Sequence, residues 1–149
     1  MSYAGAVVRI ELTVRIRRPA QDVFDLMTDL ERLPEWQSSA VEARSDGPLR
    51  EGSRIVEKRH VLGRHVENEL EVTVFEPPRR LTLKALRGPV RFTVAHELVE
   101  EEDGSTLVQV VAEGQPGRLT RLAEPFLARA AEQEMRRDFD RLKELAEGR

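Results

Sequence analysis

The chain has 149 residues, no cysteine and a formal net charge of -3. The absence of cysteine excludes a disulfide framework, a thiolate metal site and a thiol nucleophile. Basic residues are scattered among acidic ones, which argues against nucleic acid as a partner, and no apolar run approaches the roughly 20 residues that span a membrane. We therefore expect a single cytoplasmic domain over residues 1–149 whose fold depends on packing alone.

The N-terminal third predicts one strand followed by two short helices. Residues 8–16 alternate between apolar and polar side chains, which is typical of a strand with one buried face. Pro19 is suited to begin a helix, and the second helix is expected to be interrupted at Pro34, with Trp36 just beyond it. The apolar residues that recur at helical spacing after Pro19 are Val23, Phe24, Met27 and Leu30.

Residues 39–114 predict about six strands separated by regularly spaced turns. The intervals are too short for crossover helices, so neighbouring strands should be antiparallel. Glu67, Glu69 and Glu71 share one face of their strand, and the opposite face should be buried. The inward residues on this reasoning are Val66, Leu70, Val72, Val74, Leu81, Leu83, Ala85, Val90, Phe92, Val94, His96, Leu98, Val108, Val110 and Ala112. The inward face of strand 53–62 stays open, because Ile55 and Val61 compete with Val56 and Leu62.

A long C-terminal helix is predicted from just after Pro116 to about Ala146. Pro125 should cause a kink, or a separate first turn near Glu124, because an interior proline removes a backbone hydrogen bond. The helix is long enough to cross a small sheet, at about 1.5 Å per residue. Its predicted apolar stripe consists of Leu119, Leu122, Phe126, Ala130, Met135, Phe139 and Leu142.

This order of elements, together with several local strings, resembles the polyketide cyclase/dehydrase branch of the START-like (SRPBCC) superfamily, in a bacterial form. The strings are residues 16–24, 29–36, 52–54, 75–81, 103–106 and 142–143. The resemblance covers nearly the whole chain and implies an α+β helix-grip fold. In that fold a curved antiparallel sheet of six to seven strands surrounds the long C-terminal helix, with two short helices after the first strand.

A sheet curled around a helix leaves a gap where lipophilic ligands bind, and the alternative is a packed core without room for one. We expect Trp36 at the mouth of this cavity and two inward polar groups, Asn68 and His96, in its wall. The other predicted ligand-binding residues are Val72, Leu83, Phe92, Val94, Val110, Phe126 and Ala130.

His96 is the ionisable residue of most interest, because strand parity points it inward. A neutral imidazole there could bind a ligand carbonyl or hydroxyl group or act as a general base, unless it is simply a core histidine bonded to a neighbour. His60 and His65 flank a predicted turn at Gly63 without a third ligand in register, so no metal site is expected. No nucleophile elbow or Gly-rich phosphate loop is present, and no cofactor is expected.

Three functions fit these patterns. The favoured one is binding or transport of a lipophilic small molecule by a monomer or homodimer without catalysis. The alternative is a polyketide aromatase/cyclase or dehydratase with His96 as general acid/base, but few inward polar groups support it. The third, a quinone or lipid delivery protein that docks a partner, needs an apolar outer sheet face, and Glu67, Glu69 and Glu71 argue against one.

Overall fold

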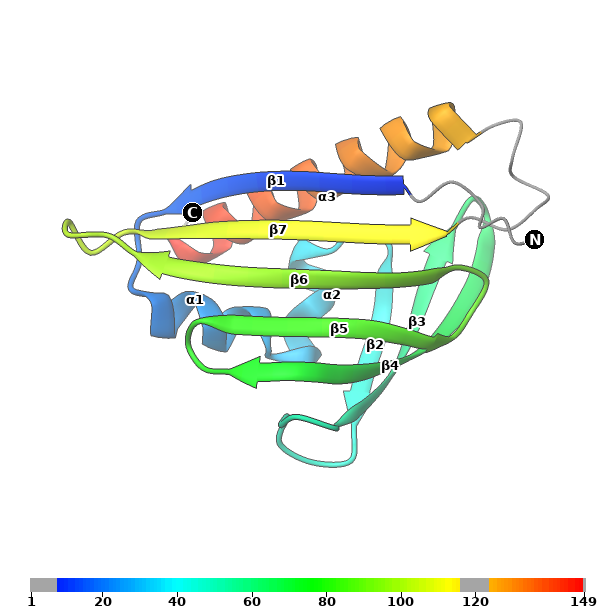
Figure 1. Cartoon of the computed structure of the whole chain (residues 1–149), viewed down its shortest axis with the longest axis horizontal. Helices are drawn as coiled ribbons and strands as arrows, with labels where there is room; N and C mark the ends of the chain where they lie inside the picture. The colour runs from blue at the N-terminus through cyan, green and yellow to red at the C-terminus, as the bar shows by residue number, and fades with distance from the viewer. Residues whose placement is uncertain (1–7, 116–123, 149) are drawn as a thin grey trace, which may run out of the picture.

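A computed structural model of the chain describes residues 8–115 and 124–148, which form a curved sheet with helices on its inner side (Figure 1). The helical elements are α1 (Ala20–Met27), the 3-10 turn η1 (Leu30–Arg32), α2 (Leu33–Trp36) and α3 (Glu124–Ala146). The strands are β1 (Val8–Ile16), β2 (Ala40–Ser45), β3 (Arg54–Val61), β4 (Arg64–Glu76), β5 (Arg80–Arg87), β6 (Arg91–Glu100) and β7 (Thr106–Gln115). Among the described residues, no helix combines the length and apolar character needed to cross a membrane.

The seven described strands form one antiparallel sheet in the order β1-β7-β6-β5-β4-β3-β2. Strands β2 to β7 are a continuous meander, and β1 completes the sheet by pairing with β7 from Val8↔Gly114 to Ile16↔Thr106. The prediction of six antiparallel strands after the first strand and helices is therefore confirmed. Because α3 packs against β1 and α1 contacts β6, the helices cover the concave face and the core lies between them and the sheet.

The alternating patterns explain most of the sheet. In β1 the predicted inner residues Ile10, Leu12 and Ile16 are buried, whereas the polar residues between them are not. The turn between β3 and β4 forms at Leu62 and Gly63, whose φ angles are 52° and 77°. Two consecutive positive φ angles match the right-handed twist of the flanking strands, so this two-residue turn fixes the register of the hairpin.

Aromatic side chains join the helices to the sheet. The rings of Trp36 and Phe139 meet edge to face with centroids 5.3 Å apart, which links α2 to α3. Phe24 of α1 packs in the same way against Phe75 of β4, at 5.6 Å. These contacts hold the helices against the core while leaving space beside them.

Two expectations about proline and turn positions need correction. Pro34 does not interrupt a helix but lies in the first turn of α2, where its missing N–H costs nothing, and Trp36 is the last residue of that helix. Val90 is 39% exposed because it lies in the turn before β6 begins. Pro125 lies in the first turn of α3, which begins at Glu124. The expected helical residues before it, including Leu119 and Leu122, lie outside the described residues.

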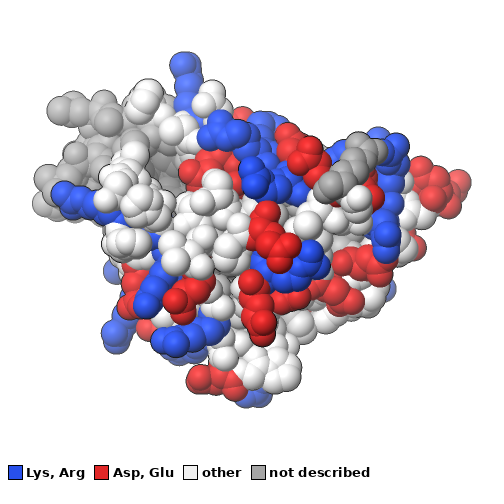
Figure 2. Space-filling model, turned by 180° about the vertical axis from the view of Figure 1, so that it is seen from behind, with Lys and Arg blue, Asp and Glu red and all other residues white. Residues whose placement is uncertain are grey.

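Basic and acidic side chains are interspersed over the surface seen from behind in Figure 2. The described pairs include Arg15 with Glu101 at 2.7 Å and Arg136 with Glu132 at 3.1 Å. Exposed pairs of this kind each contribute well under about 1 kcal/mol. On the face in view, basic and acidic side chains are mixed rather than gathered by sign.

The C-terminal end of α3 is fastened to the end of β1 by Glu147. Its carboxylate accepts a hydrogen bond from the backbone N–H of Arg17 at 2.8 Å and another from Lys143 at 3.0 Å. Lys143 also donates to the carbonyl oxygen of Arg15 at 2.7 Å. The Arg17 N–H, with Lys143 and Arg17 side chains, lowers the pKa of Glu147 to about 2.

We predict that Glu147→Gln lowers the free energy of unfolding by about 1 kcal/mol at neutral pH, because the amide is a weaker acceptor for these donors. The lowered pKa means that the native carboxylate contributes stability above about pH 4.5, and that this contribution disappears as the pH falls toward 2. Urea unfolding of both proteins across this range should show the curves converging at acidic pH. A constant difference at every pH would contradict the assignment.

Candidate ligand-binding cavity

A cavity of about 250 Å³ lies between the inner face of the sheet and the helices. Its apolar wall includes Leu30, Leu33, Leu70, Leu83, Val94 and Met135. For comparison, an apolar cavity of about 150 Å³ in another protein holds benzene. The space therefore suits a somewhat larger molecule, such as one with fused rings.

Six of the ten predicted ligand-binding residues line this cavity. They are Trp36, Asn68, Leu83, Phe92, Val94 and His96. Val72 and Val110 belong instead to the packed core, at 0% and 1% exposure. A role for any of them in ligand binding stays a prediction.

Phe126 and Ala130 do not form the expected helix wall of the cavity. Phe126 is 73% exposed, and Ala130 is also exposed. At about 100° per residue, the two point to nearly the opposite side of α3 from Met135 and Phe139, which do line the cavity. The predicted stripe had joined two different faces of the helix across the five-residue interval between Ala130 and Met135.

A buried polar cluster in the cavity wall was not predicted from the sequence. Glu57 is only 2% exposed, and its carboxylate accepts two hydrogen bonds from Arg59, at 2.8 and 3.0 Å. Asn68 donates to the same carboxylate at 2.8 Å. Arg59 also donates to Ser39 Oγ at 2.7 Å and to Gln37 Oε1. We call these five residues the polar cluster.

The polar cluster settles the parity of strand 53–62. Ile55 and Glu57 are buried, whereas Lys58 on the opposite face is exposed, so the inner face carries a glutamate and an arginine that a hydrophobicity pattern assigns to solvent. Val61 shares the parity of Ile55 but is exposed at the end of the strand. The pairing Glu57↔Asn68 places the amide directly across from the carboxylate. A signal was available in the sequence, because Glu57 and Arg59 have the same parity as Ile55 and complementary charges.

Asn68 also contacts the turn between β5 and β6. A Cβ atom added to Gly88 would lie 2.1 Å from Asn68 Oδ1, which no real structure tolerates, and the φ angle of 143° is itself unfavourable for other residues. The amide is therefore held between the carboxylate of Glu57 and the backbone of this turn.

Asp138 ties α3 to the chain segment that follows α2. Its Oδ1 accepts a hydrogen bond from the backbone N–H of Ser38 at 3.1 Å, and the residue is 7% exposed. Burial raises the pKa of the Asp138 carboxyl, and so does nearby Glu134, while the Ser38 N–H and Arg59 act in the opposite direction. The carboxyl adds an acidic group to the helix wall of the cavity.

His96 is buried and bonded through one ring nitrogen. Nδ1 lies 2.9 Å from the carbonyl oxygen of Leu81, which can only accept, so Nδ1 carries the proton and Nε2 is left as an acceptor. Burial lowers the pKa of His96 to about 4. The ring is therefore neutral at physiological pH, and Nε2 suits a ligand hydroxyl group.

His60 and His65 pair across the β3–β4 hairpin, with ring centroids 5.0 Å apart on an exposed surface. Within the described ranges, no group of three His, Cys, Asp or Glu side chains could hold a metal ion.

Residues 7–147 match the family model described as "Polyketide cyclase / dehydrase and lipid transport". The chain belongs to this family, as the resemblance predicted. A search of curated proteins finds no match.

Solved structures with this fold come from several organisms. TTHA0849 from Thermus thermophilus superposes with a TM-score of 0.77 at 15% identity, covering 93% of this chain and 96% of that one. A START superfamily protein from Mycobacterium smegmatis gives 0.64 at 17% identity, with coverage of 87% and 97%. The di-domain ARO/CYC StfQ from the steffimycin biosynthetic pathway gives 0.71 at 19% identity, over 93% of this chain but 44% of that one. At these identities the similarity shows the fold alone, which is the helix-grip fold that the resemblance implied.

We predict that Glu57→Gln destabilises the protein by about 2–3 kcal/mol, because it leaves the largely buried guanidinium of Arg59 without its counter-charge. Glu42→Gln is a suitable control, since the Glu42 side chain is 49% exposed and lies 4.0 Å from Lys58. The control should change the free energy of unfolding by less than about 0.5 kcal/mol. Equal effects of the two substitutions in chemical denaturation would contradict the structural role given to Glu57.

We also predict that His96 makes stability depend on pH between about 6.5 and 4. Below 6.5 the unfolded chain binds a proton at this position and the native protein does not, so stability falls until the native pKa of about 4 is reached. NMR titration of the imidazole measures the pKa directly. His96→Gln should remove this part of the pH dependence, and an unchanged profile would show that other groups cause it.

Proposed function

We propose that this protein binds a lipophilic small molecule in the cavity between the sheet and α3. The observation that carries the proposal is a cavity of about 250 Å³ whose wall is mostly apolar, with polar groups confined to distinct positions. Such a lining is typical of small-molecule sites, where apolar contacts supply affinity and a few polar groups set orientation. The family, which includes lipid transport in its description, is consistent with this function.

The polar groups suggest what kind of molecule fits. His96 Nε2 provides an acceptor for a hydroxyl group, and Trp36 Nε1 is a buried donor without a partner among the described residues. The polar cluster, by contrast, is already internally bonded and offers few free groups. A planar molecule of one or two fused rings with a hydroxyl or carbonyl substituent matches this arrangement.

The enzyme alternative, a polyketide aromatase/cyclase or dehydratase, depends on His96 as the base. A general base is most effective when its pKa is near the working pH, and the pKa of His96 is about 4. Glu57 and Arg59 are committed to each other and Asp138 is bound to the backbone N–H of Ser38, which leaves Glu134 as the carboxylate of the described lining without such a commitment. Binding without catalysis therefore accounts better for the side chains that line the cavity.

The proposal can be tested with N-phenylnaphthylamine, a neutral fluorescent probe. Trp36 is the single tryptophan of the chain and lines the cavity, so energy transfer from it to the probe reports binding there. Val94→Phe should weaken binding at least tenfold because it fills the cavity, at a cost of about 1–3 kcal/mol in stability. Circular dichroism and thermal unfolding establish that the variant remains folded.

Val99→Phe is the matched control, since Val99 is on the same strand but is 45% exposed. It should bind the probe like the wild type. Failure of the wild type to bind the probe, or equal binding by the two variants, would overturn the proposed function.

A further inference from the structure

The sheet opens between β5 and β6 at one end. The ladder joining these strands ends at Lys84↔Thr93. Beyond that pair, β5 stays bonded to β4, with Arg87 opposite Glu69, and β6 stays bonded to β7, with Arg91 opposite Gln115. We call this opening the β5–β6 gap. Along the gap, β5 and β6 have no further ladder pairs with each other in the described sheet.

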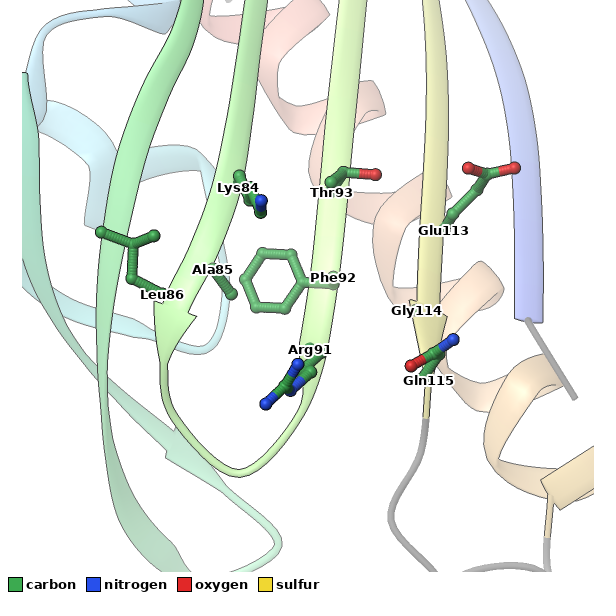
Figure 3. Close-up of a pocket in the computed structure, with 9 residues that line it drawn as sticks. All are labelled: Lys84, Ala85, Leu86, Arg91, Phe92, Thr93, Glu113, Gly114 and Gln115. Atoms are coloured by element: carbon green, nitrogen blue, oxygen red, sulfur yellow. The ribbon is translucent and has the colours of Figure 1, made fainter. Parts of the chain in front are cut away.

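The ring of Phe92 fills the β5–β6 gap (Figure 3). Phe92 lines the inner cavity and also an outer hollow of about 430 Å³ on the surface. Its side chain is half-buried and packs against the hydrophobic core. A single side chain therefore separates the cavity from the outside at this position, and a rotation of that ring would connect the two spaces.

Two cationic side chains lie on either side of the ring, Lys84 from β5 and Arg91 from β6 (Figure 3). Neither forms an ion pair within the part of the chain that the structure describes, although most of the basic residues nearby do. Glu113 lies in the same hollow, but its carboxylate is bound to Arg9 at 2.6 Å. Glu71 is opposite Lys84 on β4 without an ion pair between them. The rim of the gap thus presents two uncompensated positive charges.

The cavity interior has the opposite character. Its only cation among the described lining residues, Arg59, is neutralised by Glu57, and the helix wall contributes Glu134 and Asp138. An anionic group placed there would lose its hydration without gaining a free counter-charge. The same group at the rim would meet Lys84 and Arg91 and stay partly hydrated.

We propose that the β5–β6 gap is a ligand portal closed by Phe92, and that the ligand is an amphipathic acid. Its apolar ring system occupies the cavity, while its carboxylate remains at the rim between Lys84 and Arg91. This inference rests on the proposed function and adds to it the ligand class, the direction of entry and the orientation of the bound molecule.

The ligand class is tested with two probes of similar shape: anilinonaphthalene sulfonate, which is anionic, and N-phenylnaphthylamine, which is neutral. The double substitution Lys84→Glu/Arg91→Glu should weaken binding of the anionic probe about tenfold at low salt and that of the neutral probe less than about twofold. Both positions are exposed, so the fold is retained. High salt should reduce the difference between wild type and variant.

Arg44→Glu/Arg141→Glu is the matched control, because it makes the same change in net charge at exposed positions outside the hollow. It should leave the affinity for the anionic probe within about twofold of wild type. An equal loss in the control would show that net charge alone acts, and would overturn the assigned ligand class.

The portal is tested by stopped-flow kinetics with the neutral probe. Phe92→Ala should raise both the association and the dissociation rate several-fold, and Phe92→Trp should lower both, because the residue acts on the barrier to passage. Phe126→Ala, at an exposed position on α3, should change neither rate. Unchanged rates in both Phe92 variants, or an effect confined to dissociation, would overturn the portal.

The two levels of the proposal fail in different ways. Absence of neutral probe binding, or its persistence in Val94→Phe, contradicts the cavity and with it the portal. Normal cavity binding combined with no effect of the Lys84/Arg91 and Phe92 substitutions contradicts the portal and the acid alone. In that case the proposed binding function stands.

Discussion

The ion pair between Glu57 and Arg59 is the constraint on which the cavity depends. Two charges withdrawn from water must satisfy each other fully, and here five side chains from β3, β4 and the segment after α2 do so together. This requirement fixes how that segment lies against the sheet. Asp138 of α3 accepts a hydrogen bond from the backbone N–H of Ser38 in this segment, so the same constraint extends to α3. The apolar space exists because these polar contacts hold its walls in place without filling it.

The sequence predicted the sheet better than it predicted the site. Alternation in β1 and around Glu67–Glu71 identified the buried faces, since each of those strands separates acids or arginines from aliphatic residues. The same reasoning was undecided for β3, because its inner face is charged and only tertiary pairing with Asn68 makes that burial possible. On α3 the stripe was wrong at Phe126 and Ala130, where hydrophobicity was counted without following the helical angle. His96 was placed inward correctly, but its bond to Leu81 depends on strand register, which the pattern does not contain.

Because of how the charged groups are distributed, the cavity interior and the rim of the β5–β6 gap differ in what they can recognise: the interior recognises the shape of a ligand, and the rim recognises its charge. Inside, Glu57 and Arg59 neutralise each other and Asp138 is held by the backbone of Ser38, so discrimination between ligands there rests largely on volume and on single hydrogen bonds. At the rim, Lys84 and Arg91 act through longer-range attraction that weakens with salt. A pocket organised in this way can accept many ligands whose apolar parts have a suitable size. It would nevertheless hold them all in one orientation.

Gly88 links these two regions. Because Asn68 Oδ1 occupies the space that any side chain at position 88 would need, the turn joining β5 to β6 must approach the inner amide with bare backbone. The turn at the gap and the carboxylate of Glu57 are therefore separated by one side chain only. A substitution at this surface turn would be transmitted directly to the buried charges, so a residue that looks peripheral in the sequence is mechanically part of the cavity.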